Sequence, residues 1–330
     1  MSTKRLEQAA QATKTAFVFP GQGSQKVGML AELAEQFSVV RDTFAEASAA
    51  LGFDLWHIAQ SGEGLDQTEN TQPVLLTASI ALWRVWLELG GIAPKYLAGH
   101  SLGEYSALVA AEAMTLADAV KLVHLRGKLM QSAVPQGTGA MAAILGLADE
   151  KVIDLCQKVN ASAAGQGSVE AANYNAQGQV VIAGSTALVQ QVMAEAKEQS
   201  GKAIALPVSV PSHCTLMKPA AEKFAEALEQ TAIELPHLPV IQNVNAEIAT
   251  DVAQLRQALT AQLYQSVQWT RTMQSLQDQG IQYIVECGPG TVLSNLAKRL
   301  PNIEKAFSID SKSKMEDALN AVLVAEGKIA

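Results

Sequence analysis

The chain has 330 residues, 48% of them hydrophobic and 17% charged, which is enough to bury the core of one large or two smaller domains. Its formal net charge of −8 argues against nucleic acid as the main partner. Arg84 and Glu88 break the most apolar stretch, so no membrane span is expected, and Pro20 ends a run too short for a secretory signal. Three cysteines without a CxxC pair are typical of reduced thiols, so we expect a cytoplasmic protein without a metal site.

The first half of the chain alternates predicted strands with predicted helices. Residues 1–14 are polar and alanine-rich, and we expect them to form an N-terminal extension. Residues 17–19 have the composition of a buried strand that ends at Pro20-Gly21. Residues 73–89 follow helical spacing, with Pro73 in the first turn. A capping box of Thr115 and Asp118 then predicts the start of a helix that carries Arg126.

Residues 137–206 have the pattern of a separate unit. Its apolar runs and helical periods follow the order strand, helix, strand, strand, helix, strand, which is the ferredoxin-like pattern. Alternating α/β signals resume after it, so residues 15–136 and 207–330 are expected to share one core. The predicted fold class is α/β: an α/β-hydrolase-like parallel-sheet core with an inserted ferredoxin-like subdomain.

The most informative motif is Gly99-His100-Ser101-Leu102-Gly103, which has the GxSxG form. A short apolar run precedes it and a helix-compatible run follows, which is the strand, turn and helix that a nucleophile elbow needs. The glycines allow a sharp corner, and the N–H groups at the helix start can stabilise an oxyanion. The alternative is a glycine-bounded turn with an incidental serine.

A serine nucleophile needs a base, and His213 is the best candidate among five histidines. It lies in a loop shortly after a predicted strand, where the sites of α/β sheets gather. No Asp or Glu lies between Gly201 and Pro211, so the acid of an ordinary hydrolase triad is missing there. A backbone carbonyl at a helix end could orient the imidazole instead, because the last carbonyls of a helix have no intrahelical partner.

A second glycine pattern, Gly21-Gln22-Gly23, could be read as a dinucleotide-binding turn. The third glycine of GxGxxG would fall at Lys26, and no acidic residue closes a second strand about 20 residues further on. We therefore expect no nucleotide cofactor.

Several motifs together resemble the bacterial malonyl-CoA:acyl carrier protein transacylases of type II fatty acid synthesis. They run in family order from about Thr15 to Arg299 and leave the N-terminal extension outside. They are FVFPGQGSQ at 17–25, GHSLGEYSA at 99–107, Arg126-Gly127, Asn173-Tyr174-Asn175, Pro211-Ser212-His213, Gln262-Leu263-Tyr264 and Gly288-Pro289-Gly290.

The resemblance implies a role for each matching residue. Ser101 would be the acylated nucleophile and His213 its base. The backbone carbonyl of Gln262 would accept a hydrogen bond from the imidazole and orient it. The oxyanion N–H groups would come from Gln22 and Leu102. Arg126 would pair with the free malonyl carboxylate, a bidentate task that suits a guanidinium. Further substrate contacts would come from Asn173, Asn175 and Ser212.

The resemblance also implies the reaction: ping-pong transfer of a malonyl group from malonyl-CoA to acyl carrier protein, without a cofactor, by what we expect to be a monomer. Three alternatives remain open from the sequence: a serine esterase or thioesterase with the same elbow, an acyltransferase that serves a polyketide pathway, and a non-enzymatic scaffold that binds carrier proteins.

Acyl carrier proteins of this pathway are acidic, as is this chain, so docking needs a local basic patch. Lys298 and Arg299 lie together at the end of the helix predicted after Gly288-Pro289-Gly290, and Lys218 lies a few residues beyond His213. We predict that some of these residues form the patch.

Overall fold

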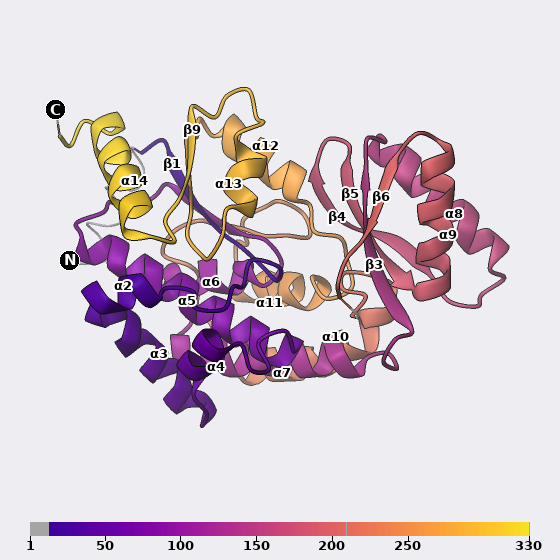
Figure 1. Ribbon diagram of the computed structural model, residues 1–330, viewed down its shortest axis with the longest axis horizontal. Coiled ribbons are helices and arrows are strands. Elements are labelled where there is room, and N and C mark those ends of the chain that lie inside the picture. Colours follow the sequence, from indigo (N-terminus) through magenta and orange to yellow (C-terminus); the bar gives the residue numbers. More distant parts are fainter. Residues whose placement is uncertain (1–12, 209, 330) are drawn as a thin grey trace.

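The computed structural model describes residues 13–208 and 210–329. The predicted N-terminal extension lies outside the described residues except for its last two. Figure 1 shows two sheets, one toward each end of the long axis, with helices packed on both. None of the described helices is long and apolar enough to cross a membrane.

The first sheet is parallel throughout, in the order β7-β2-β1-β8-β9. Its strands are β1 (Thr15–Phe19), β2 (Tyr96–Gly99), β7 (Val240–Ile241), β8 (Tyr283–Glu286) and β9 (Lys305–Ser308). Every residue of β1 is buried, as expected for a central strand covered on both faces.

Alternation along β1 divides the apolar core between the two faces of this sheet. Phe17 and Phe19 join the larger cluster, whereas Ala16 and Val18 join the smaller one with α12 and α13. The helices are α2 (Ala31–Gln36), α3 (Ser38–Leu51), α4 (Leu55–Ser61), α5 (Thr68–Glu88), α6 (Gly103–Ala110), α7 (Leu116–Ser132), α10 (Lys218–Gln230), α11 (Val252–Ala261), α12 (Trp269–Asp278), α13 (Val292–Ala297) and α14 (Lys312–Ala325).

Helix α5 begins earlier than the sequence predicts. It starts at Thr68, so Pro73 lies inside the helix and not at its first position. Proline has no N–H, which leaves the carbonyl of Glu69 without its usual helical donor. That carbonyl lies 2.7 Å from Nδ1 of His124 on α7. The longer helix also places Gln72 in the buried interior.

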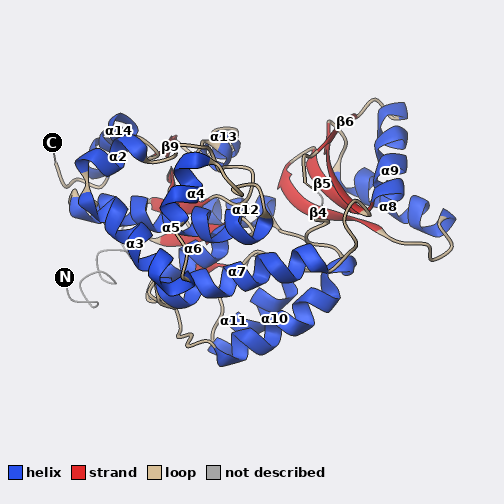
Figure 2. Cartoon of the chain, turned by 60° about the horizontal axis from the view of Figure 1, so that its bottom comes forward, coloured by secondary structure: helices blue, strands red, loops and turns tan. Residues whose placement is uncertain are grey.

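The second sheet is antiparallel, in the order β4-β5-β3-β6. Its elements are β3 (Gly139–Leu145), α8 (Asp149–Ser162), β4 (Val169–Ala176), β5 (Gln179–Ser185), α9 (Thr186–Glu198) and β6 (Lys202–Ala205). Figure 2 shows α8 and α9 together on the side of this sheet away from the parallel-sheet core. This is the ferredoxin-like arrangement, so the predicted fold class is confirmed. All these elements fall within residues 137–206, although the domain boundaries themselves stay a prediction.

Strand β4 also pairs with a segment of the parallel-sheet core. The N–H of Tyr174 donates to the carbonyl of Val267, and the N–H of Val267 donates to the carbonyl of Ala172, each at 2.9 Å. Asn173 therefore lies where β4 is hydrogen-bonded to a segment between α11 and α12, which fixes its position relative to the core.

Candidate active site

Ser101 lies at the sharp turn between β2 and α6, as the elbow motif predicts. Its φ of +53° is in the left-handed region, which a non-glycine residue rarely occupies. The turn also needs close approach of the backbone. A Cβ on Gly103 would lie 1.9 Å from the carbonyl oxygen of Phe19, so only glycine fits there.

Asn243, two residues after β7, holds the elbow in place, although this role was not predicted from the sequence. Its Oδ1 accepts from the Ser101 N–H at 2.7 Å, and its Nδ2 donates to the Gly99 carbonyl at 2.6 Å. One amide side chain thus satisfies a donor and an acceptor on the two sides of the strained turn. The signal that could have found it is the position of Asn243 just beyond the end of a short buried strand.

His213 lies beside Ser101, as predicted. Its Nε2 is 2.8 Å from Ser101 Oγ, and its Nδ1 is 2.6 Å from the backbone carbonyl of Gln262. A carbonyl only accepts, so Nδ1 carries the hydrogen and Nε2 is free to accept from the serine hydroxyl. Burial, reinforced by the charge of Arg126, lowers the pKa of His213 to about 3, so the imidazole is neutral at neutral pH.

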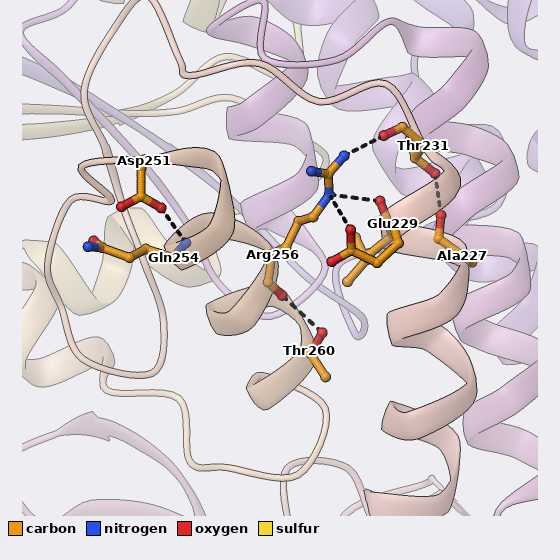
Figure 3. A network of polar contacts seen from close by, with 8 residues as sticks. Ala227, Glu229, Thr231, Asp251, Gln254, Arg256 and Thr260 are labelled. Atoms are coloured by element: carbon orange, nitrogen blue, oxygen red, sulfur yellow. Dashed lines mark hydrogen bonds and ion pairs between the residues drawn. The ribbon is translucent and has the colours of Figure 1, made fainter.

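The Gln262 carbonyl is available because Gln262 is the C-cap of α11, where carbonyls lose their helical partners. Helix α11 is in turn fixed to the end of α10 by Arg256, as Figure 3 shows. Arg256 donates from Nε to the carbonyl of Leu228 at 3.0 Å and from Nη2 to that of Thr231 at 2.9 Å. This clamp holds α11 against the end of α10 and so helps to position the helix whose C-terminal carbonyl meets the imidazole.

Arg126 lies behind Ser101 and is fully buried. Its Nη2 is 3.4 Å from Ser101 Oγ and donates to Oε1 of Gln262 at 2.9 Å, while its Nη1 donates to Oε1 of Gln72 at 2.9 Å. The sequence placed Arg126 on a helix but not against the serine. The guanidinium donates to neutral groups, and no carboxylate among the described residues makes a direct ion pair with it.

The side chain of Gln262 connects the remaining groups. Its Nε2 donates to the Ser101 carbonyl at 3.0 Å and to Oε2 of Glu104 at 2.6 Å. Glu104 is almost completely buried, and burial raises its pKa to about 7. Gln262 thus contributes both a backbone carbonyl and a side chain, whereas the sequence analysis predicted only the carbonyl.

A cavity of about 210 Å³ opens in front of Ser101 and His213, between the two sheets. The predicted residues Gln22, Asn173, Asn175 and Ser212 all line it. His100, which the sequence analysis did not select, lines it too, with its Nε2 2.7 Å from Oδ1 of Asn175.

The two backbone N–H groups predicted for an oxyanion belong to Gln22 and Leu102. Within residues 13–208 and 210–329, neither has a protein hydrogen-bond acceptor, whereas the N–H groups of Gly103 and Glu104 are bonded within the turn. Both N–H groups are thus open to an acceptor from outside the protein.

The three basic residues predicted for docking lie in two places. Arg299 donates to Oε1 of Gln179, a cavity-lining residue, at 3.3 Å, and Lys298 is its neighbour after α13. Lys218 instead lines a separate hollow, with its Nζ 5.8 Å from the ring centroid of Tyr264.

Among the described residues, no group of three or more His, Cys, Asp or Glu side chains could hold a metal ion.

Comparison with known proteins shows the family to which this chain belongs. The acyl transferase domain family matches residues 16–319, so the chain belongs to this family. A relative from Escherichia coli strain K12, named malonyl CoA-acyl carrier protein transacylase, is 52% identical over 310 residues, which are 93% of this chain and 99% of the relative. The resemblance to these transacylases is therefore confirmed.

Solved structures of similar proteins support the same family. A crystal structure described as FabD from Acinetobacter baumannii has 91% identity and a TM-score of 0.93, covering 95% of this chain and 99% of that one. A second structure holds a type II PKS acyl-carrier protein in complex with its malonyl-transacylase. That match has 48% identity and a TM-score of 0.90, and covers 93% of this chain and 99% of the matched chain.

Proposed function

We propose that this protein transfers the malonyl group of malonyl-CoA to the phosphopantetheine thiol of an acyl carrier protein, through a malonyl ester of Ser101. One observation carries the proposal: Ser101 Oγ lies between a neutral imidazole at 2.8 Å and a buried guanidinium at 3.4 Å. The first can activate the hydroxyl, and the second can bind a carboxylate attached to the acyl group. The names of the relatives support the same reaction.

In the first half-reaction, Ser101 Oγ attacks the thioester carbonyl while His213 Nε2 takes its proton. The Gln262 carbonyl, carrying partial negative charge at a helix end, stabilises the imidazolium that forms. The N–H groups of Gln22 and Leu102 stabilise the oxyanion. The C–S bond then breaks, and CoA leaves as a thiol with the proton from His213.

Arg126 gives the reaction its preference for malonyl groups. A malonyl ester on Ser101 brings its carboxylate into reach of Nη2, because the guanidinium already lies next to Oγ. The bound malonyl carboxylate also neutralises the charge of Arg126, and this affects the pKa of His213. The Arg126 charge helps to lower the pKa of His213, so a bound carboxylate makes the imidazole a stronger base.

In the second half-reaction, the thiol of the carrier protein replaces CoA, and the same histidine activates it. Two half-reactions through one covalent intermediate give ping-pong kinetics. The proposed chemistry needs no cofactor beyond the two substrates. We also propose that the enzyme works as a monomer in the cytoplasm, which size-exclusion chromatography and cell fractionation would test.

Intact-mass spectrometry after mixing with malonyl-CoA tests the function directly. We expect a malonyl adduct on Ser101, located by peptide mapping and absent in Ser101→Ala, that disappears when holo-acyl carrier protein is added. An adduct on Cys214, or no adduct at all, would contradict the proposal. Steady release of malonate without a thiol acceptor would instead support a thioesterase.

A further inference from the structure

Glu104 is a buried carboxyl group that the reaction above does not use. It lies on α6, one turn from Ser101, and its side chain is almost fully buried. Its Oε2 accepts from Gln262 Nε2 at 2.6 Å and from the Asn243 backbone N–H at 3.3 Å. Glu104 therefore contacts both Gln262, whose carbonyl orients His213, and Asn243, which holds the elbow.

We propose that Glu104 is a positioning residue that is ionised while the cavity is empty and takes up a proton when the substrate's carboxylate binds against Arg126. The inference rests on the proposed function, because it requires an acyl group that carries a carboxylate. Glu104 does not touch the substrate; it acts through Gln262, whose Oε1 accepts from Arg126 and whose carbonyl accepts from His213.

The first argument is the balance of charge in the buried network. Its ionisable members are Arg126, His213 and Glu104, and His213 is neutral, so above about pH 7, where Glu104 is ionised, the empty site holds one cation against one anion. A malonyl carboxylate adds a second anion to this desolvated space. One buried cation cannot compensate two carboxylates, and a proton on Glu104 removes the excess charge.

The second argument is the geometry of the carboxyl group itself. Both of its hydrogen bonds converge on Oε2, whereas Oε1 is buried without a hydrogen-bond partner among the described residues. An ionised carboxylate loses more solvation at a bare oxygen than a neutral acid does. The group is therefore close to balance between its two forms, in agreement with a pKa of about 7.

The surroundings leave Arg126 as the group that controls this balance. Several elements pack against α6. Among their described ionisable side chains, Arg126 of α7 is the one whose charge lowers the pKa of the Glu104 carboxyl. On α6 itself, Tyr105 stays neutral because burial raises its pKa far above neutrality. From α11 and from the segment after β7, the groups that meet Glu104 are the amides of Gln262 and Asn243.

The covalent step stays balanced. The Ser101 Oγ–C bond forms, the C–S bond breaks, and the serine proton leaves on CoA through His213. The additional proton comes from solvent and goes to Glu104. Acylation by malonyl-CoA therefore takes up a proton, and acylation by acetyl-CoA does not.

The test is the pH dependence of the acylation equilibrium. The full-length enzyme is mixed with malonyl-CoA and CoA at fixed ratio between pH 7 and 8.5, and the acylated fraction is read by intact mass. If a proton is taken up, the equilibrium constant falls as pH rises, by up to about tenfold per pH unit. Glu104→Gln keeps a carbonyl oxygen as acceptor but cannot titrate, so we expect its equilibrium constant to show only the pH dependence that comes from ionisation of CoA. Ionisation of CoA affects both proteins equally and cancels in their ratio.

Three results would overturn the proposal. The first is an acylation equilibrium of the wild-type enzyme that does not depend on pH. The second is a Glu104→Gln curve that follows the wild-type curve, which would place the proton on His213. The third is a slope with acetyl-CoA that equals the slope with malonyl-CoA. The acetyl comparison uses wild-type enzyme and stays decisive even if Glu104→Gln does not fold. Absence of any acyl-enzyme would instead contradict the proposed function itself.

Discussion

The two walls of the cavity differ in chemistry. The wall from the parallel-sheet core holds Ser101 and His213, with Arg126 and Glu104 buried behind them. The cavity-lining residues from the ferredoxin-like subdomain are neutral: Met141, Asn173, Asn175, Gln179, Val181 and Leu206. The core therefore contributes the charged groups and the groups that transfer protons, while the subdomain contributes the shape of the cavity and neutral hydrogen-bonding groups.

Changing His213 should have the largest effect, because it removes the base from the charged wall. His213→Ala is expected to slow acylation by a factor on the order of a hundred to ten thousand. Rapid quench followed by intact mass measures the rate, and circular dichroism checks the fold. A loss of less than tenfold would mean that another group activates Ser101.

Arg126→Ala should lower the specificity constant for malonyl-CoA by about a hundredfold or more, since a buried carboxylate loses its partner. Acetyl-CoA, which lacks the carboxylate, should be affected far less. Arg126→Lys is the matched control, because it keeps the charge without the planar fork. Equal losses for the two substrates would assign Arg126 a structural role.

The neutral wall can be tested by giving it a charge. Asn173→Asp should lower kcat/KM for malonyl-CoA at pH 8 by about tenfold more than Asn173→Ala does, because a second carboxylate repels the first across a desolvated cavity. With acetyl-CoA the two variants should behave alike. If Asn173→Asp is no worse than Asn173→Ala with malonyl-CoA, neutrality of this wall is not what matters.

The smallest effect is expected at the rim. Reversing the charges of Lys298 and Arg299 should reduce transfer to acyl carrier protein by about threefold to tenfold at low salt and flatten its salt dependence. Transfer to free pantetheine should barely change. Lys218→Glu, in the separate hollow, is the matched comparison and shows whether that lysine belongs to the patch. If both acceptors respond alike, the docking surface lies elsewhere.

Much of the site could be predicted because its signals are local. The elbow depends on two glycines that flank Ser101 at a distance of two residues, and the missing acid near His213 favoured a helix-end carbonyl, the kind of group that lies 2.6 Å from Nδ1. The order of strands and helices in residues 137–206 was also readable, because each element has its own apolar period.

The residues that the sequence did not reveal act over long separations. Gln72 and Asn243 meet the site only when α5 and the segment after β7 pack against α6. Glu104 is close to Ser101 in sequence, but its partner Gln262 is 158 residues away. Gln72 was obscured further because Pro73 suggested a helix start. The preceding turn is helical because the freed carbonyl of Glu69 finds a partner on α7, a tertiary contact that overrides the local signal.

The pairing of β4 with Val267 has a consequence for motion. A hinge-like opening of the subdomain would have to break the two hydrogen bonds between Tyr174, Val267 and Ala172. The amide protons of Tyr174 and Val267 should therefore exchange with solvent together and slowly, at a rate set by a shared opening event. The pantetheine arm is then expected to meet a subdomain wall that these hydrogen bonds already hold against the core.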